Sequence, residues 1–129
     1  NPTKTIIYGN VLWDGSADHS ARELYYGIIN PAQNTGIVAT GTTLADAYQL
    51  PAGQHYGIGT VAVNTGVKLH NVSALPGPCC VIDNEGANTL KIYPGGGGTI
   101  NGAANITLAA GAIAMLVCCD FATDKWKTI

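Results

Sequence analysis

The residues able to do acid–base or metal chemistry are few and widely separated in this sequence. His19, His55 and His70 have no spacing that a metal-ligand motif would need. Asp83 and Glu85 flank a predicted turn and, like Asp14, could serve a hydrolase as carboxylates. Turns commonly carry such acids in contact with solvent. We therefore predict that the chain is not an enzyme, with no catalytic residue, no metal site and no cofactor.

The four consecutive glycines at residues 95–98 resemble part of a phosphate-binding loop. Such loops need a Lys followed by Ser or Thr, or a GxGxxG spacing that opens a helix. Neither pattern occurs here, so we expect a flexible hairpin or bend.

The cysteines form two adjacent pairs, Cys79-Cys80 and Cys118-Cys119. Neighbouring residues of a strand face opposite sides of a sheet, so each pair should place one thiol inward and one outward. A cross-strand disulfide can form if the two strands are adjacent, and the alternative is free thiols that pack as small apolar groups. The spacing does not match a zinc-binding CxxC motif.

The composition is typical of a compact β protein. The 129 residues include 17 glycines and only 11% charged residues, against ~25% in average globular proteins. So few charges suit a surface that is covered by partner subunits. The alternative is a compact β protein whose solvent-facing surface is simply uncharged. The net charge is −2 and the six Lys and Arg residues are scattered, so no nucleic-acid partner is expected. No apolar run approaches the ~20 residues that cross a bilayer, so no membrane partner is expected either.

The centre of the chain predicts short strands separated by turn residues. The run at 112–119 is apolar on both faces, which predicts a central strand covered on both sides; a helix over residues 112–117 is the alternative. The segment 44–50 fits a helix or an irregular turn, and Asn101-Gly102 favours a tight turn. Trp126 should anchor a terminal edge strand with Lys125 and Lys127 in solvent. The predicted strands are residues 36–43, 56–63, 67–69, 79–83, 89–93, 104–108, 112–119 and 125–129.

These patterns predict an all-β chain with a single β-sandwich or barrel-like domain of short antiparallel strands, residues 31–129, preceded by an extended N-terminal arm, residues 1–30. The arm is rich in Ile, Tyr and Trp and must be buried. It either completes the sheet of the domain in its own chain or packs on a neighbouring subunit. Asn30-Pro31 resembles a hinge between the arm and the domain, which favours packing of the arm on a neighbouring subunit. The candidate capsid or subunit interface consists of Ile6, Ile7, Tyr8, Leu12, Trp13, Leu24, Tyr25, Tyr26, Ile28 and Ile29.

Residues 38–129 resemble a β-rich module of structural proteins of tailed bacteriophages. The resemblance rests on TGVKL at 65–69, NEGANTLKIYP at 84–94, INGA at 100–103 and the terminal Trp126. These are turn and strand-anchor residues, and they specify a fold more closely than a task. Residues 1–30 and the cysteine pairs lie outside the motif.

The resemblance implies a virion component on the capsid surface, assembled in the host cytoplasm, where thiols stay reduced. It implies a capsid decoration (cement) protein that binds the major capsid protein and itself, as a homotrimer at local three-fold positions. The alternative is a receptor- or carbohydrate-binding module of a phage head or tail fibre. Exposed aromatic residues and glycan binding would distinguish that alternative.

Overall fold

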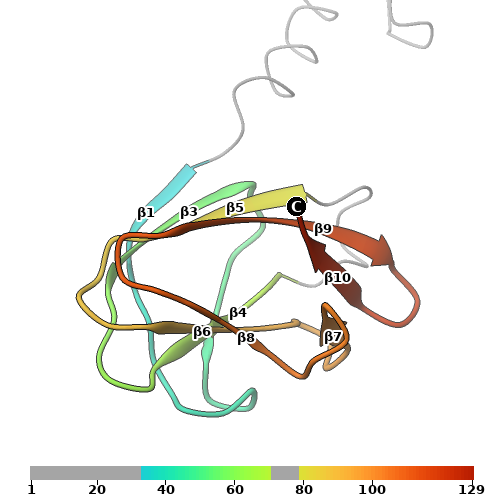
Figure 1. Ribbon diagram of the computed structural model, residues 1–129, viewed down its shortest axis with the longest axis horizontal. Coiled ribbons are helices and arrows are strands. Elements are labelled where there is room, and N and C mark those ends of the chain that lie inside the picture. The colour runs from blue at the N-terminus through green and yellow to red at the C-terminus, as the bar shows by residue number, and fades with distance from the viewer. Residues whose placement is uncertain (1–32, 71–78) are drawn as a thin grey trace, which may run out of the picture. The chain divides into compact units, whose positions relative to one another are not determined.

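The computed structural model describes residues 33–70 and 79–129, and in these residues it contains β-strands and no α-helix (Figure 1). The all-β expectation is therefore confirmed for the described residues. The strands are β1 (Gln33–Val38), β2 (Tyr48–Gln49), β3 (His55–Thr60), β4 (Gly66–Lys68), β5 (Cys79–Asn84), β6 (Leu90–Tyr93), β7 (Thr99–Ile100), β8 (Ile106–Leu108), β9 (Ile113–Asp120) and β10 (Lys125–Thr128).

The strands form two sheets that enclose one core. The six-stranded sheet has the order β1-β3-β5-β9-β10-β7, and the four-stranded sheet has the order β2-β4-β6-β8. Figure 1 shows β1, β3, β5 and β9 above, and β4, β6 and β8 below. A core between two sheets allows each strand to bury one face, which explains the alternating apolar residues of β5 and β6.

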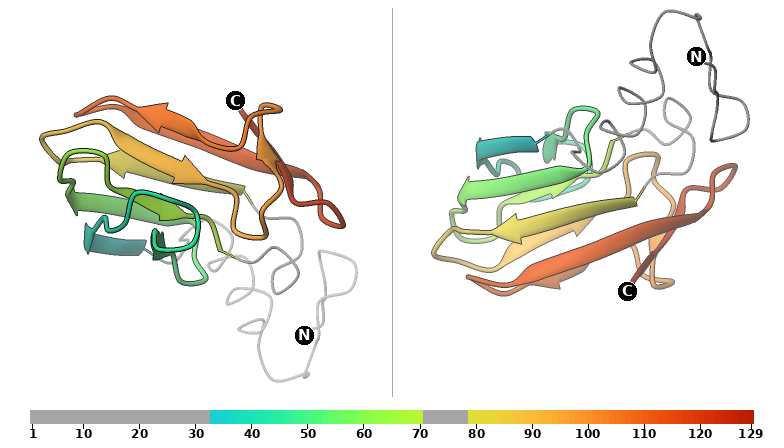
Figure 2. Two further views of the ribbon diagram at one scale, coloured as in Figure 1. Left: turned by 90° about the horizontal axis from the view of Figure 1, so that it is seen from below. Right: turned by 90° about the horizontal axis from the view of Figure 1, so that it is seen from above.

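From β1 to β6 the chain alternates between the two sheets. Each strand therefore pairs with the strand two places later, and all four of the resulting pairs are parallel. Figure 2 shows β1, β3 and β5 side by side in cyan, green and yellow. This chain path is that of a β-solenoid, in which successive coils stack on one another.

The expectation of an antiparallel sandwich or barrel is wrong for this half of the domain. An alternating pattern predicts which face of a strand is buried, but not which strand lies beside it. The pairs β5–β9, β9–β10 and β6–β8 are antiparallel as expected. The arrangement of the whole described domain is solenoid-like and not clearly a sandwich or a barrel.

Most predicted strands are present, with corrected ends. Residues 113–117 belong to the strand β9, and the run is not a helix. The strand β3 ends at Thr60, so the predicted continuation to residue 63 is wrong; Val61 is buried instead and Ala62 is exposed. The strand β10 is not an edge strand, because β7 pairs with its far side.

Turn chemistry explains several connections. Asn101 and Gly102 have φ values of 54° and 84°, and Ile100 and Ala103 exchange backbone hydrogen bonds of 2.8 and 2.9 Å. This is the tight turn that the Asn-Gly pair predicts. The ambiguous segment 44–50 is a turn followed by β2, and the Asp46 carboxylate holds the turn by accepting hydrogen bonds from the Thr43 amide and hydroxyl.

Asn84 joins the two sheets and was not expected to do so. The sequence places it in a turn, but it is the last residue of β5 and is fully buried. Its side-chain amide donates to the carbonyl oxygens of Asn88, Leu108 and Ala109, at 2.9 to 3.1 Å. Its side-chain oxygen accepts from the Gly86 amide at 3.0 Å. One side chain thus ties the end of β5 to the loop before β6 and to the end of β8.

We expect the substitution Asn84→Ala to lower the free energy of unfolding by about 3 kcal/mol, because it leaves buried carbonyl and amide groups without partners. Urea denaturation followed by circular dichroism measures the change. Gln54→Ala, which removes an exposed amide side chain, is the control and should stay within about 0.5 kcal/mol of the wild type. Equal stability of both variants would show that Asn84 does not join the sheets.

Candidate functional site

The outer face of the six-stranded sheet carries an apolar strip. On β9, Ala114, Leu116 and Cys118 face the core, so Ile113, Met115 and Val117 face outward. Ile113 is 62% exposed and Met115 is 46% exposed. Val81 on β5 lies directly opposite Met115. We call Val81, Ile113, Met115 and Val117 the apolar strip.

The strip corrects the expectation that β9 is covered on both sides. The sequence is apolar on both faces of this strand, yet within the described residues only one face meets the core. An outward row of large apolar side chains on a sheet is typical of a surface that contacts another protein.

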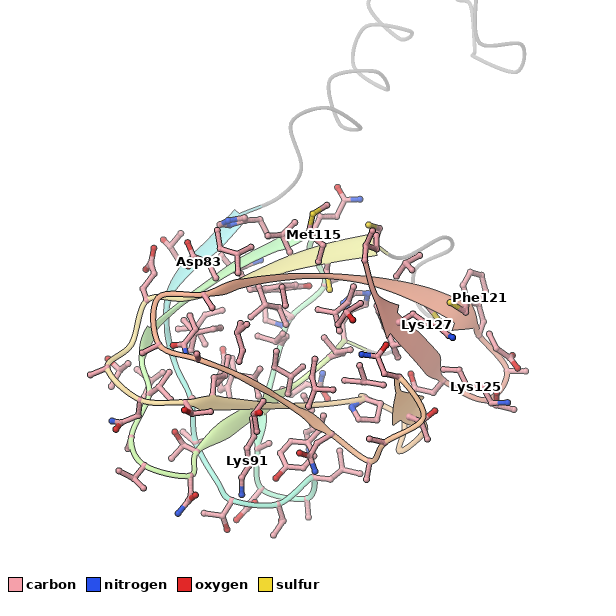
Figure 3. All side chains as sticks on the ribbon, in the orientation of Figure 1. Asp83, Lys91, Met115, Phe121, Lys125 and Lys127 are labelled. Atoms are coloured by element: carbon pink, nitrogen blue, oxygen red, sulfur yellow. The ribbon has the colours of Figure 1, made fainter. Side chains whose placement is uncertain are left out.

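Charged side chains of opposite sign lie at the two ends of the strip. Asp83 on β5 lies opposite Ile113, and Lys127 on β10 lies opposite Val117. Figure 3 shows Asp83, Met115 and Lys127 in this order along the six-stranded sheet. Glu85 follows Asp83 just after β5, and Lys125 precedes Lys127. The predicted carboxylate Asp83 therefore borders an apolar surface.

The glycine-rich loop binds a carboxylate of this same chain. The amides of Gly96 and Gly98 donate to one oxygen of Asp124, at 2.6 and 3.2 Å, and the Trp126 indole N–H donates to the other oxygen at 2.8 Å. A Cβ on Gly98 would lie 2.0 Å from the Asp124 carbonyl oxygen, so this glycine is needed for close packing. The loop turns the chain between β6 and β7, as the expected bend would, and its amides hold a buried carboxylate of the same chain.

A buried aromatic cluster lies behind this loop. His70 is 3% exposed, its Nδ1 lies 3.2 Å from the Tyr56 hydroxyl oxygen, and its ring meets Trp126 edge-on at 5.7 Å between centroids. Burial lowers the pKa of His70, and the nearby Asp124 carboxylate opposes that shift. Burial also raises the pKa of Tyr56, with a further contribution from Cys80. These groups are held neutral in the core, which suits packing better than catalysis.

The cysteines follow the inward–outward expectation. Cys80 and Cys118 are buried, Cys79 is half-buried and Cys119 is exposed, and all four are free thiols. Strands β5 and β9 are adjacent, but Cys79 lies opposite Val117 and Cys80 opposite Leu116. The cysteines of the two strands are thus offset by two residues. Burial raises the pKa of the Cys80 thiol to about 12, which makes this thiol unreactive.

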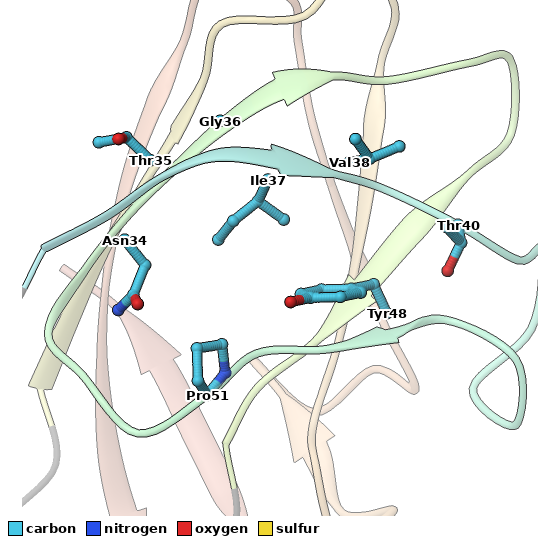
Figure 4. Close-up of a pocket in the computed structure, with 8 residues that line it drawn as sticks. All are labelled: Asn34, Thr35, Gly36, Ile37, Val38, Thr40, Tyr48 and Pro51. Carbon is cyan, nitrogen blue, oxygen red and sulfur yellow. The ribbon is translucent and has the colours of Figure 1, made fainter.

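A shallow pocket lies between the edge strands of the two sheets, β1 and β2 (Figure 4). Its volume is about 610 Å³. Figure 4 shows Ile37 and Tyr48 pointing toward the space between the strands. The Tyr48 side chain is 39% exposed. The polar lining residues include Asn34, Thr35 and Thr40.

The predicted interface residues of the arm, from Ile6 to Ile29, all lie outside the described residues. The structure therefore neither tests them nor brings them together. Sequence reasoning missed Asp124 and Tyr48. An Asp two residues before a Trp has no periodic signal. The pocket at Tyr48 depends on how β1 and β2, which belong to different sheets, are placed in the fold.

Within residues 33–70 and 79–129, no three His, Cys, Asp or Glu side chains come together in a way that could hold a metal ion. That part of the chain also has no helix long and apolar enough to cross a membrane. No protein-family model matches the sequence, and neither curated proteins nor solved structures show a significant match.

We expect acid to destabilise the domain through His70. Its pKa in the folded state lies below the unfolded value of about 6.5. As the pH falls below that value, the unfolded chain therefore binds a proton that the folded chain does not. The free energy of unfolding should fall between pH 7.5 and 5 more steeply in the wild type than in His70→Gln. The other histidines are common to both proteins, so equal slopes would contradict the assignment.

Proposed function

We propose that this chain is a non-enzymatic structural protein that decorates the outer surface of a tailed-bacteriophage capsid. The observation that carries the proposal is the apolar strip between Asp83 and Lys127, since exposed apolar surface with a charged border suits a protein partner. The partners are the major capsid protein and other copies of this chain. The phage-module resemblance of residues 38–129 is a second support.

Decoration is a mechanical task, and it needs surface rather than reactive groups. A shell under internal DNA pressure gains strength when an added protein buries area across its subunit junctions; a lasting interface buries upwards of ~2,000 Å². In this proposal residues 1–30 grip the shell or a neighbour, and the β domain supplies the outer layer. The resemblance implies a trimer at each local three-fold position. Free thiols fit assembly in a reducing cytoplasm.

Co-sedimentation with capsid shells tests this proposal. We expect the full-length protein to sediment with expanded shells of the phage that encodes it, and not with host cells. The double substitution Tyr25→Ser/Tyr26→Ser in the arm should lower shell occupancy at least several-fold, because aromatic anchors dominate such contacts. Tyr48→Ser, in the described pocket, is the matched control. Full occupancy by the arm variant would refute the role of the arm, and binding to cells alone would refute decoration.

The pocket at the β1–β2 edge favours a second candidate function, which is glycan binding by a fibre module. Sugars stack on exposed aromatic rings and hydrogen-bond to amides and hydroxyls. Tyr48 supplies a partly exposed ring, and Asn34, Thr35 and Thr40 supply the polar groups.

If this second function is correct, a glycan array should give hits with the wild-type protein that Tyr48→Ala loses at least tenfold in affinity, because the stacking platform is gone. Phe121→Ala removes an exposed ring in the β9–β10 turn, away from the pocket, and should bind as the wild type does. An array without hits would rule out this candidate.

A further inference from the structure

The apolar strip and its charged ends have an internal symmetry. Asp83 is on β5, the strand on one side of β9, and it lies opposite Ile113, two residues before Met115. Lys127 is on β10, the strand on the other side of β9, and it lies opposite Val117, two residues after Met115. In the register of the sheet, Met115 therefore lies midway between Asp83 and Lys127.

The two charges do not satisfy each other within one chain. A diagonal step between neighbouring strands is about 7–8 Å, so two such steps separate the Cα atoms of Asp83 and Lys127 by about 15 Å. Each charged group is therefore available to a partner that brings the opposite sign to the same end of the strip.

We propose that the outer face of the six-stranded sheet binds the same face of a second copy of this chain. The two copies are related by a two-fold axis at Met115, and Asp83 of each copy faces the partner subunit's Lys127. The two-fold axis lies in the plane of the interface and is perpendicular to the line from Asp83 to Lys127. Rotation about this axis therefore exchanges the two ends of the strip. It brings opposite charges together twice and places the apolar strips against each other.

The contact is isologous, as in most homo-oligomers, and closes without leaving an open strip for a third copy. The apolar residues supply most of the binding free energy, because exposed ion pairs add only modest amounts. The charges fix the orientation, since a copy turned the other way would set like charges against each other. This pairing goes beyond shell decoration. If a trimer also forms through other surfaces, pairing of trimers gives six copies.

The mass of the full-length protein, measured by light scattering over a range of concentrations, tests the pairing without any shell. We expect an even number of copies, and Met115→Glu should halve the mass by placing two carboxylates at the axis. The dissociation constant for pairing should be more than about tenfold higher for the Met115→Glu variant than for the wild type. Val63→Glu is the matched control, because Val63 is 69% exposed in the turn after β3 and should leave the mass unchanged. A mass of one copy, or of three, would overturn the proposal, as would an unchanged mass of the Met115 variant.

Charge reversal tests the orientation. Asp83→Lys and Lys127→Asp should each weaken pairing, and a mixture of the two variants should recover it, because every contact in the mixed pair again joins opposite signs. Lys91→Asp, on β6 of the other sheet, is the control for the change in net charge (Figure 3). A mixture that does not pair would overturn the proposed contact between Asp83 and the partner's Lys127. Shell binding is measured separately by co-sedimentation, so the failure of pairing and the failure of decoration are distinguishable.

Discussion

The alternation of the chain between two sheets is the constraint on which the rest of the structure depends. The strands β3, β5 and β6 bury apolar side chains against the opposite sheet. From β1 to β6, the hydrogen-bonding partner of a strand arrives only after the chain has visited the other sheet. Short strands can persist in such a stack because every coil supports the next. A glycine at a close approach lets neighbouring coils pack tightly: a Cβ on Gly66 of β4 would lie 2.8 Å from the Lys91 carbonyl oxygen of β6.

Two buried polar side chains hold this stack together at its loops. Asn84 links β5 to the loop before β6 and to the end of β8, and Asp124 links the glycine-rich loop to the β9–β10 turn and to Trp126. Buried polar groups are costly unless they are fully hydrogen-bonded, so each one favours a single arrangement of the loops it contacts. The apolar core supplies stability, and these two side chains supply its specificity.

The same architecture accounts for a surface that suits assembly. The strand β9 is apolar on both faces because one face completes the core and the other forms the strip around Met115. A sheet holds such side chains in a fixed, flat array, so little conformational entropy is lost when another protein covers them. The neutral, buried state of His70 and the internal use of the Asp124 carboxylate leave these groups to structure. Both features agree with the mechanical role that we propose.

The sequence by itself determined the all-β class, strands over most of residues 79–83, 89–93 and 112–119, the Asn101-Gly102 turn and the inward–outward division of the cysteines. These features are local, because they follow from side-chain alternation and from the φ values that single residues prefer. Only the tertiary structure decided that neighbouring strands are parallel, that Asn84 and Asp124 are buried, and that Asp83 and Lys127 lie symmetrically about Met115. Those outcomes depend on which distant strands become neighbours, and a period of two residues carries no information about that choice.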